Sequence, residues 1–418
     1  MRTQLFILFI MVSFSISAQG TLTLEECYII VEKNYPISKQ SNLLEEKSKT
    51  EVSVLNKGKL PQVNLNAQAT YQSDVIQLPI QLPNISLDTP NKDQYRATLD
   101  VNQLIYNGGS ISAKTNLKKA ELKTQQQQVV VNLHSLKARV NKNFFNVLLI
   151  QEQIKQLNSK KEQLNERLTE VKSGVKHGAI LPSTEQMLMA EILKLEQQIL
   201  ETDYNRVKAL NHLASLLSIN LPNQTALSRP QILIAEDTQS RRPELKLFDF
   251  QENQLQTTKE IISKSNYPLL VGFAQVGYGN PGLNMLDNSF QDFYITGLRL
   301  SWNILDWGKV NKQQKAVEIS KEILLTEKET FVLNNNIQLN EAKTDIEKFE
   351  KTLLKDIEII NLREQVLQAA TSQFQNGVIT SSEYIIELNN LYEAKISKEL
   401  HQTQLSLAKA NYKVIKGE

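Results

Sequence analysis

The chain has 418 residues, and its 47 Lys and Arg against 45 Asp and Glu give a formal net charge of +2. This balance provides no general attraction to polyanions, so a nucleic-acid-binding protein is not expected. The single cysteine, Cys27, excludes an intrachain disulfide and a multi-cysteine metal centre, and the four histidines show no ligand spacing, so no cofactor is expected.

The first 18 residues have the features of a secretory signal peptide. Arg2 supplies the positive region, residues 5–14 the apolar stretch, and residues 15–18 the small side chains before the expected cleavage. No later stretch approaches 18 continuous apolar residues, so a mature chain that crosses a membrane must do so as β-strands. An uncleaved anchor is the alternative interpretation of these residues.

The rest of the chain is predicted to be two tandem copies of one unit. Three pairs of segments match in the same order: 60–71 with 267–278, 95–109 with 294–308, and 176–185 with 375–384. The offset is 207 residues for the first pair and 199 for the other two. Such ordered self-similarity indicates a duplication.

Each repeat is expected to contain a short helix, two strands and two long helices. The first repeat is expected at 19–219, a linker at 220–242 and the second repeat at 243–418. The elements are expected at these places: strands at about 61–74, 94–106, 267–279 and 291–304, and long helices at about 110–175, 183–218, 309–374 and 381–415.

The strand segments alternate polar and apolar residues, which places each set on one face of a sheet. Arg96 and Asp100 in the first repeat and Arg299 in the second belong to the polar set, and we expect them to face a pore. The apolar set ends in tyrosines, as is typical of a lipid-facing band with aromatic rims. An ordinary soluble sandwich fits the alternation equally well.

The helical segments carry coiled-coil heptads for more than five repeats, as in 136–175. One helix over 110–174 would be about 95 Å long at roughly 1.5 Å per residue, which no compact domain accommodates. Turns are expected at 178–182 and 377–381, each followed by a return helix with a second apolar stripe. Contacts with more than one neighbouring helix indicate a cylinder of helices.

Four strands cannot close a sheet in a membrane, where each unpaired backbone group costs several kcal/mol. Three copies would supply twelve strands and twelve long helical strands. The predicted fold is mainly α with membrane β: a trimeric 12-stranded β-barrel continuous with a long α-helical barrel, each protomer a tandem repeat of a β-hairpin and a long helical hairpin.

Five segments together resemble the TolC-like outer membrane efflux protein family across essentially the whole mature chain: LTLEECYIIVEKNYP (22–36), NQLIYNGG (102–109), RRPEL (241–245), SWNILDWGK (301–309) and NGVITSSEY (376–384). The resemblance implies a passive outer-membrane channel of a Gram-negative bacterium, not an enzyme, with its helical barrel in the periplasm. It further implies a homotrimer in outer-membrane lipid. A periplasmic adaptor and an inner-membrane transporter would deliver small molecules or proteins for efflux or secretion.

The resemblance also places a periplasmic gate at the helical tips. Gly178 and Gly377 would occupy the tips that meet the adaptor. Glu383 stands where the gate carboxylate of the family is expected, and three copies would form an acidic ring with a site for divalent ions. Glu387 is a candidate for a second ring, one turn further on.

Two features oppose a simple double ring of carboxylates. The second acidic position of the family falls at Ile386, one residue before Glu387, and the first repeat has Thr184 where the second has Glu383. A gate is therefore expected to be asymmetric between the repeats. The alternative interpretation of Glu383 is a helix-capping residue paired with Thr380 or Ser381.

Three other protein classes are alternatives for this sequence. An enzyme is disfavoured because the sequence has no Gly-rich phosphate loop, His/Cys cluster or nucleophile elbow. A periplasmic coiled-coil adaptor or another structural envelope protein would share the signal peptide and long hairpins, but should lack the duplicated amphipathic strands. An adhesin stalk would be expected to lack the return helices.

Overall fold

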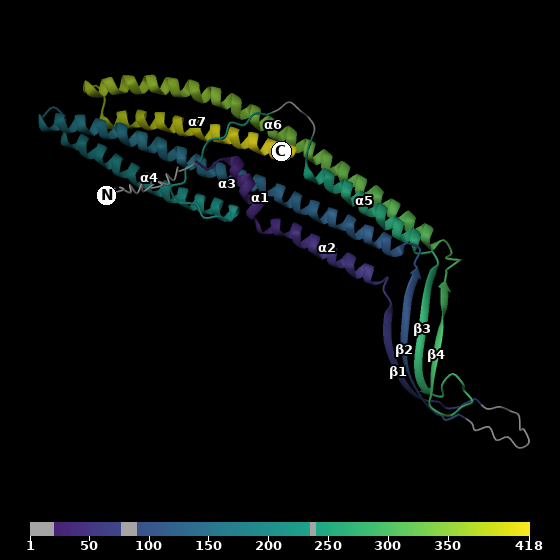
Figure 1. The fold of residues 1–418 in the computed structure, drawn as a ribbon. Coiled ribbons are helices and arrows are strands. Elements are labelled where there is room, and N and C mark those ends of the chain that lie inside the picture. The colour runs from purple at the N-terminus through teal and green to yellow at the C-terminus, as the bar shows by residue number, and fades with distance from the viewer. Residues whose placement is uncertain (1–20, 77–89, 235–239) are drawn as a thin grey trace, which may run out of the picture. The chain divides into compact units, whose positions relative to one another are not determined.

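The computed structural model describes residues 21–76, 90–234 and 240–418 (Figure 1), so the signal peptide expected at residues 1–18 lies outside the described residues. The helices are α1 Leu24–Asn34, α2 Gln40–Lys57, α3 Ser110–Lys176, α4 Pro182–Leu217, α5 Pro243–Lys264, α6 Lys309–Gln375 and α7 Ser381–Lys416, with a 3-10 helix at Pro36–Lys39. The strands are β1 Gln62–Tyr71, β2 Asp93–Tyr106, β3 Leu269–Asn280 and β4 Gln291–Ser301.

The duplication extends to the lengths of the long helices. Helices α3 and α6 each have 67 residues, and α4 and α7 each have 36. Neither α3 nor α6 contains proline, and Gly174 near the end of α3 is their only glycine, so nothing in their sequences interrupts the helical hydrogen bonds. The prediction of a mainly helical chain with few strands is confirmed.

The described residues form two compact units, and neither coincides with a sequence repeat. The helical unit comprises 21–38, 131–234, 240–242 and 332–418, and the strand unit comprises 39–76, 90–130 and 243–331. Each unit takes segments from both repeats because α3 and α6 each contribute one part to each unit.

The strand unit contains one antiparallel sheet of four strands in the order β1-β2-β3-β4. The pairing of β2 with β3 joins the two repeats, whereas β1 and β4 each have one neighbour among the described strands. Strand β1 ends at Tyr71 rather than near 74, and β4 ends at Ser301 rather than near 304. Both of these outer strands are thus three residues shorter at this end than expected.

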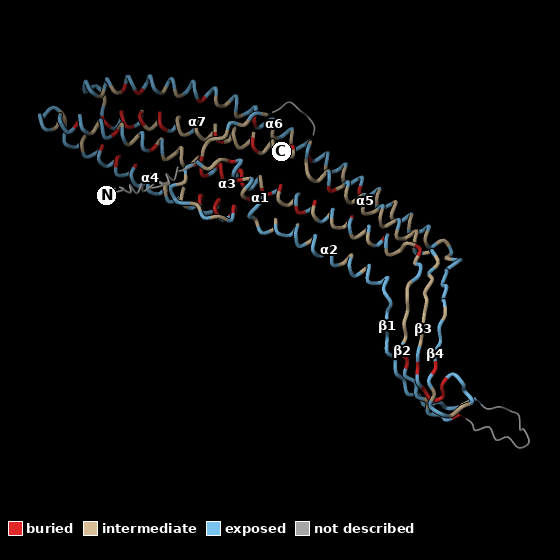
Figure 2. Tube along the Cα trace, in the orientation of Figure 1, coloured by how far each residue is buried: buried red, intermediate tan, exposed pale blue. Residues whose placement is uncertain are grey.

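The sheet register separates an apolar face from a polar face. Leu65, Leu99, Val276 and Tyr294 lie side by side across the four strands on one face, because each is paired with the next. The neighbouring row on the other face begins with Asn64, Asp100 and Gln275. Figure 2 shows the sheet mostly exposed or half-buried, so neither face is covered as a core would be.

The helical unit buries two apolar clusters, whose positions appear as buried segments in Figure 2. The first joins α1, α3, α4 and α7 and includes Phe144, Phe145 and Leu213. The second joins α3, α4, α6 and α7 and includes Leu164, Leu188 and Tyr384. The return helices therefore contact several neighbours, as their second apolar stripe predicted. None of the helices described for this chain has an apolar stretch long enough to cross a bilayer.

Candidate functional site at the helical tips and the polar sheet face

The two tip turns have the same backbone geometry. Gly178 has φ +74° and Gly377 has φ +70°, a left-handed conformation that favours glycine. The amide N–H of Ala179 donates to the Gly174 carbonyl (2.9 Å), and that of Val378 donates to the Gln373 carbonyl (2.8 Å). These bonds cap the last turn of α3 and of α6 and reverse the chain into α4 and α7.

Glu383 forms a capping box with Thr380 at the start of α7. The Glu383 carboxylate accepts from the Thr380 backbone N–H (2.8 Å) and hydroxyl (2.9 Å), while the Glu383 N–H donates to the Thr380 hydroxyl (3.3 Å). These bonds lower the pKa of the exposed Glu383 carboxyl, the backbone bond being the main cause. The capping partner is Thr380 rather than Ser381, and the carboxylate remains ionised and accessible to water.

The first tip starts its return helix differently. Leu181 occupies the N-cap position of α4 without a side-chain hydrogen bond, and Pro182 is the first helical residue. Proline suits this position because its fixed φ is already helical and its missing N–H would have no partner there. With Thr184 at the place of Glu383, the first tip carries no carboxylate at this point, so the two repeats differ chemically where their folds agree.

Glu387 is paired, in contrast to Glu383. Its carboxylate lies 3.4 Å from the Arg363 guanidinium of α6 and accepts from the Asn390 side-chain amide at 3.2 Å. A partly buried carboxylate with a cationic partner has less charge to offer a passing ion. The adjacent Ile386 is exposed, so the second acidic position of the family has an apolar side chain here.

Sequence reasoning missed a contact between the two repeats beside the tips. The Tyr384 ring, next to Glu383, is fully buried and stacks on Phe374 with centroids 5.3 Å apart. The Arg167 guanidinium of α3 lies 5.4 Å from the Tyr384 ring centroid, and Arg167 also pairs with Glu170. The neighbouring Glu383 is charged and exposed, whereas the contact between the repeats is made by the buried ring of Tyr384.

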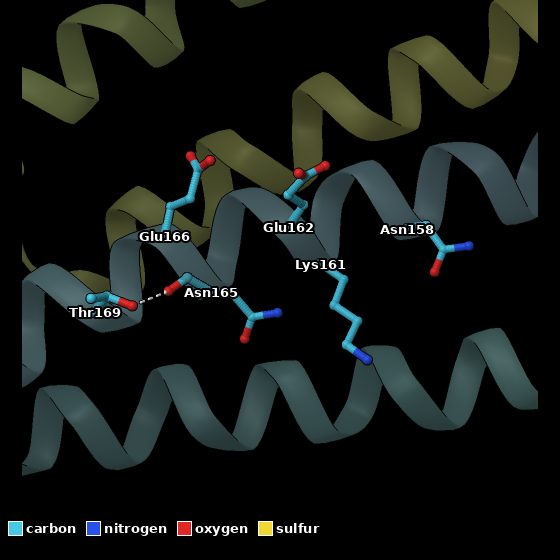
Figure 3. A pocket seen from close by; sticks show the side chains of 6 residues that line it. All are labelled: Asn158, Lys161, Glu162, Asn165, Glu166 and Thr169. Carbon is cyan, nitrogen blue, oxygen red and sulfur yellow. Dashed lines mark hydrogen bonds between the residues drawn. The ribbon is translucent and has the colours of Figure 1, made fainter.

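A polar groove follows one side of α3, with a volume of about 460 Å³ (Figure 3). Six side chains from this helix line it: Asn158, Lys161, Glu162, Asn165, Glu166 and Thr169. The Lys161 ammonium reaches Glu196 of α4 at 2.8 Å. All six lining side chains are polar, so the groove is a wall suited to water rather than a pocket for a small-molecule ligand.

The structure brings Arg96, Asp100 and Arg299 to the same face of the sheet. The ladder pairs Asp100 with Gln275, and Gln275 accordingly lies on the face that carries Arg96 and Arg299. Asp100 accepts hydrogen bonds from Gln275 and Asn66 and, at 3.1 Å, from the Thr98 hydroxyl. The two guanidiniums are exposed, and by register they lie at opposite ends of the strands with Asp100 between them.

Two aromatic rings on this polar face were not predicted. Phe273 packs over Gly297 with Arg299 above it at 5.0 Å, and Phe293 packs over Gly277 with Arg96 above it. The alternation in 268–278 is weak because the polar face of β3 carries Phe273 and Gly277 in place of polar side chains. The glycine opposite each phenylalanine is the signal that could have indicated these stacks.

Within the part of the chain that the structure describes, no group of three or more His, Cys, Asp or Glu is arranged to hold a metal ion. The candidate gate carboxylates Glu383 and Glu387 also do not form such a group within one chain.

Comparison with solved structures identifies the fold. The outer membrane protein VceC of Vibrio cholerae matches with a TM-score of 0.65 at 15% identity, covering 94% of this chain and 96% of VceC. The CmeC outer membrane channel of Campylobacter jejuni matches with 0.63 at 14%, covering 94% and 84% of the two chains. The open-state MtrE outer membrane channel of Neisseria gonorrhoeae matches with 0.65 at 15%, covering 94% and 89%. No curated protein matches by sequence.

The chain therefore shares its fold with solved structures of outer membrane proteins, two of which are outer membrane channels. Over residues 39–218 the chain matches the family model of the outer membrane efflux protein. The resemblance to TolC-like efflux proteins drawn from the sequence is confirmed over this segment, and the matched family and structures are described as outer membrane proteins. The family is one of transport components.

Proposed function

We propose that the chain is the outer membrane channel of a tripartite efflux or secretion system, and that it acts as a passive exit duct in the form of a homotrimer. The observation that carries the proposal is the four-stranded sheet, which has one apolar face and, among the described strands, an outer edge on β1 and on β4 that no further strand pairs with. In lipid, unpaired backbone groups at such edges each cost several kcal/mol. Closure by further copies removes them, and three copies give a barrel of twelve strands.

The apolar face supports a lipid environment. Leu65 is 77% exposed, Tyr294 75% and Leu298 69%, and by register all three belong to one face of the sheet. A continuous apolar surface of this kind is unfavourable in water, at roughly 25 cal/mol for each Å². Tyr71 and Tyr278 lie at the loop end of this face, where an aromatic rim meets the lipid headgroups.

The polar face then forms the lining of the duct. Arg96, Asp100 and Arg299 would face water in the closed assembly, where ionised side chains lose little solvation. The polar groove of α3 would give the helical part of the duct a similar wall. Such a lining favours transit over binding, so the choice of cargo, small molecules or proteins, falls to the inner-membrane transporter.

The tips are the proposed gate and the proposed contact with the periplasmic adaptor. Gly178 and Gly377 hold the turns that end the two hairpins, and Glu383 places an ionised, exposed carboxylate beside the second turn. Three such carboxylates around one axis would attract divalent cations. Glu387 contributes less in this proposal because Arg363 already balances its charge.

The proposal is tested with the full-length protein in native outer membranes and in planar bilayers. It predicts sedimentation with outer membranes, migration as a heat-modifiable trimer and discrete conductance steps. Co-purification after crosslinking should recover an adaptor and an inner-membrane transporter. Recovery in the soluble periplasm without conductance would instead favour a coiled-coil adaptor and would overturn the proposal.

A further inference from the structure

Two strand-to-helix junctions in the strand unit have the same hydrogen bonds. Gly109 N–H donates to the Asn107 side chain (3.1 Å), and Gly308 N–H donates to the Asp306 side chain (2.9 Å). The backbone bonds from Ser110 to Asn107 and from Lys309 to Asp306 are both 3.0 Å long. Position 307 therefore occupies in the second repeat the place that position 108 occupies in the first.

The residues at these two places differ sharply. Gly108 has φ +63° and is buried, whereas Trp307 has φ +54° and is 87% exposed. Glycine adopts a positive φ freely, while a bulky residue such as tryptophan is disfavoured there. Glycine at 307 would relieve this strain, so an exposed tryptophan here points to a contact of the indole with another molecule.

The surroundings of Gly108 indicate what the indole meets. A side chain at position 108 would overlap Tyr267, which lies just before β3. The counterpart of Tyr267 in the first repeat is Leu60, at the 207-residue offset of the repeats. Both residues sit in the same turn, since Leu60 N–H donates to Lys57 O (3.0 Å) and Tyr267 N–H donates to Lys264 O (3.2 Å).

The strands that lead into the two junctions, β2 and β4, also differ in where they end. Strand β2 runs to Tyr106 because its last residues pair with β3, with Leu104 opposite Val271 and Tyr106 opposite Leu270. Strand β4 stops at Ser301, the counterpart of Asn102, opposite Leu269, where its partner among the described strands, β3, begins. The residues that follow, 302–305, have the sequence WNIL and are exposed, as expected of a strand end whose partner is missing.

We infer that a second copy of this chain completes the junction after β4, with the Trp307 indole against Leu60 of the neighbouring copy. This contact corresponds to the one between Gly108 and Tyr267. The difference is that the aromatic ring is at the strand-to-helix junction (Trp307) and not at the turn before the strand (Leu60). Within the chain, the small Gly108 faces the large Tyr267. Between copies, the large Trp307 faces the smaller Leu60. The inference rests on the homotrimer of the proposed function and adds the residues and the register of its joint.

The register follows from the pairing of β2 with β3. Val101 lies opposite Ala274 within the chain, and the repeat offsets convert this pair into Leu300 opposite Ala67 of the neighbouring copy. Likewise, Leu99 opposite Val276 converts into Leu298 opposite Ala69. Apolar residues again face one another on the lipid side, so the face assignment is preserved across the joint.

The first test replaces Trp307 by glycine, the residue that the first repeat already carries at this place. A purely local role predicts an unchanged or more stable trimer, because the left-handed strain is relieved. Our inference predicts that the SDS-resistant trimer dissociates several degrees lower. The W307A variant should behave in the same way, and L286A, in the exposed loop before β4, should leave the dissociation temperature unchanged.

The second test fixes the register by disulfide formation in full-length protein carrying C27S. The pair L300C and A67C should form a disulfide between copies on oxidation, since directly opposite residues have the Cβ separation that a disulfide needs. The shifted pair L300C and A69C should react much less. Preferential crosslinking of the shifted pair, or a trimer as stable with W307G as without it, would overturn the inference. A monomer without conductance would instead overturn the proposed function.

Discussion

The Arg167 guanidinium of α3 lies 5.4 Å from the centroid of the Tyr384 ring at the start of α7, so the two repeats are joined beside the second tip. Tyr384 is fully buried among residues of α3, α4, α6 and α7. An aromatic ring under a cation contributes on the order of 1 kcal/mol, and its burial contributes more. The position of the second tip relative to the first thus depends on Tyr384.

Tyr384 should therefore tolerate loss of its hydroxyl but not of its ring. The hydroxyl is buried without a hydrogen-bond partner in the described structure, so Y384F should leave the free energy of unfolding equal or raise it by about 1 kcal/mol. Y384A should lower it by about 3–5 kcal/mol, because a cavity opens in the cluster. Chemical unfolding of the detergent-solubilised protein, followed by circular dichroism, measures both. Marked destabilisation by Y384F would reveal a partner for the hydroxyl.

Gly377 should resist substitution for a conformational reason alone. A Cβ at this position would meet nothing within 4 Å, yet φ is +70°. G377A should therefore lower the free energy of unfolding by about 1–2 kcal/mol, and G377N by less, since asparagine accepts this conformation more readily. The same substitutions at Gly178, which also has open space and φ +74°, should lower the free energy of unfolding by a similar amount. Equal stability of G377A and the parent protein would contradict this assignment.

Glu383 should give α7 a stabilising cap that acid removes. Its pKa lies below the ordinary value of 4.5, so the contribution is complete above that value. It is lost as the pH falls further, through the lowered pKa. E383Q keeps the acceptor but loses the charge, so its stability should depend less on pH in this window. Thermal unfolding between neutral and acidic pH measures the difference.

The charge of Glu383 should also appear in conductance. If three copies form an acidic ring, E383Q and E383A should both weaken block by divalent cations several-fold in planar bilayers. Glu26 is the matched control, because it forms the same capping box with Thr23 at the start of α1 and its pKa is also lowered. E26Q should alter the acid stability but leave divalent block unchanged. Unaltered block in E383A would leave Glu383 with its capping role only.

The two faces of the sheet should differ in their access to water. In native outer membranes, R299C should react with a charged, water-soluble thiol reagent, whereas L298C on the opposite face should not. Native Cys27 is a suitable silent background, because burial, and to a smaller extent the nearby Glu26, raises the pKa of its thiol to about 12. Equal labelling of both variants would contradict a lipid-facing assignment for Leu298.

The long helices were predictable because their signal is long and redundant. A heptad pattern of more than five repeats, without proline in α3 or α6, specifies long helices, and the helix lengths follow from it. The polar face of β3 was not predictable in the same way. Phe273 and Gly277 interrupt the alternation there, and their stacks depend on residues of β4 that only the folded register brings opposite.

The tips also combine local features that were predictable with contacts between helices that were not. The sequence placed Gly377 and the capping box of Glu383, because both depend on residues within a few positions of each other. It did not reveal that Arg363 pairs with Glu387 or that Arg167 lies over Tyr384, since these partners are 24 and more residues apart and on different helices. Contacts between helices depend on their rotation and stagger, which a periodic pattern specifies only coarsely.

The pairing of β2 with β3 has an evolutionary consequence. An ancestor with a single repeat would have required six identical copies to close the proposed barrel, and all six joints would have carried the same side chains. After the duplication, three of the joints lie between strands of the same chain, and the other three lie between strands of different chains. The two kinds of joint then became free to diverge, as in Gly108 with Tyr267 within the chain and the inferred pair of Trp307 with Leu60 between copies.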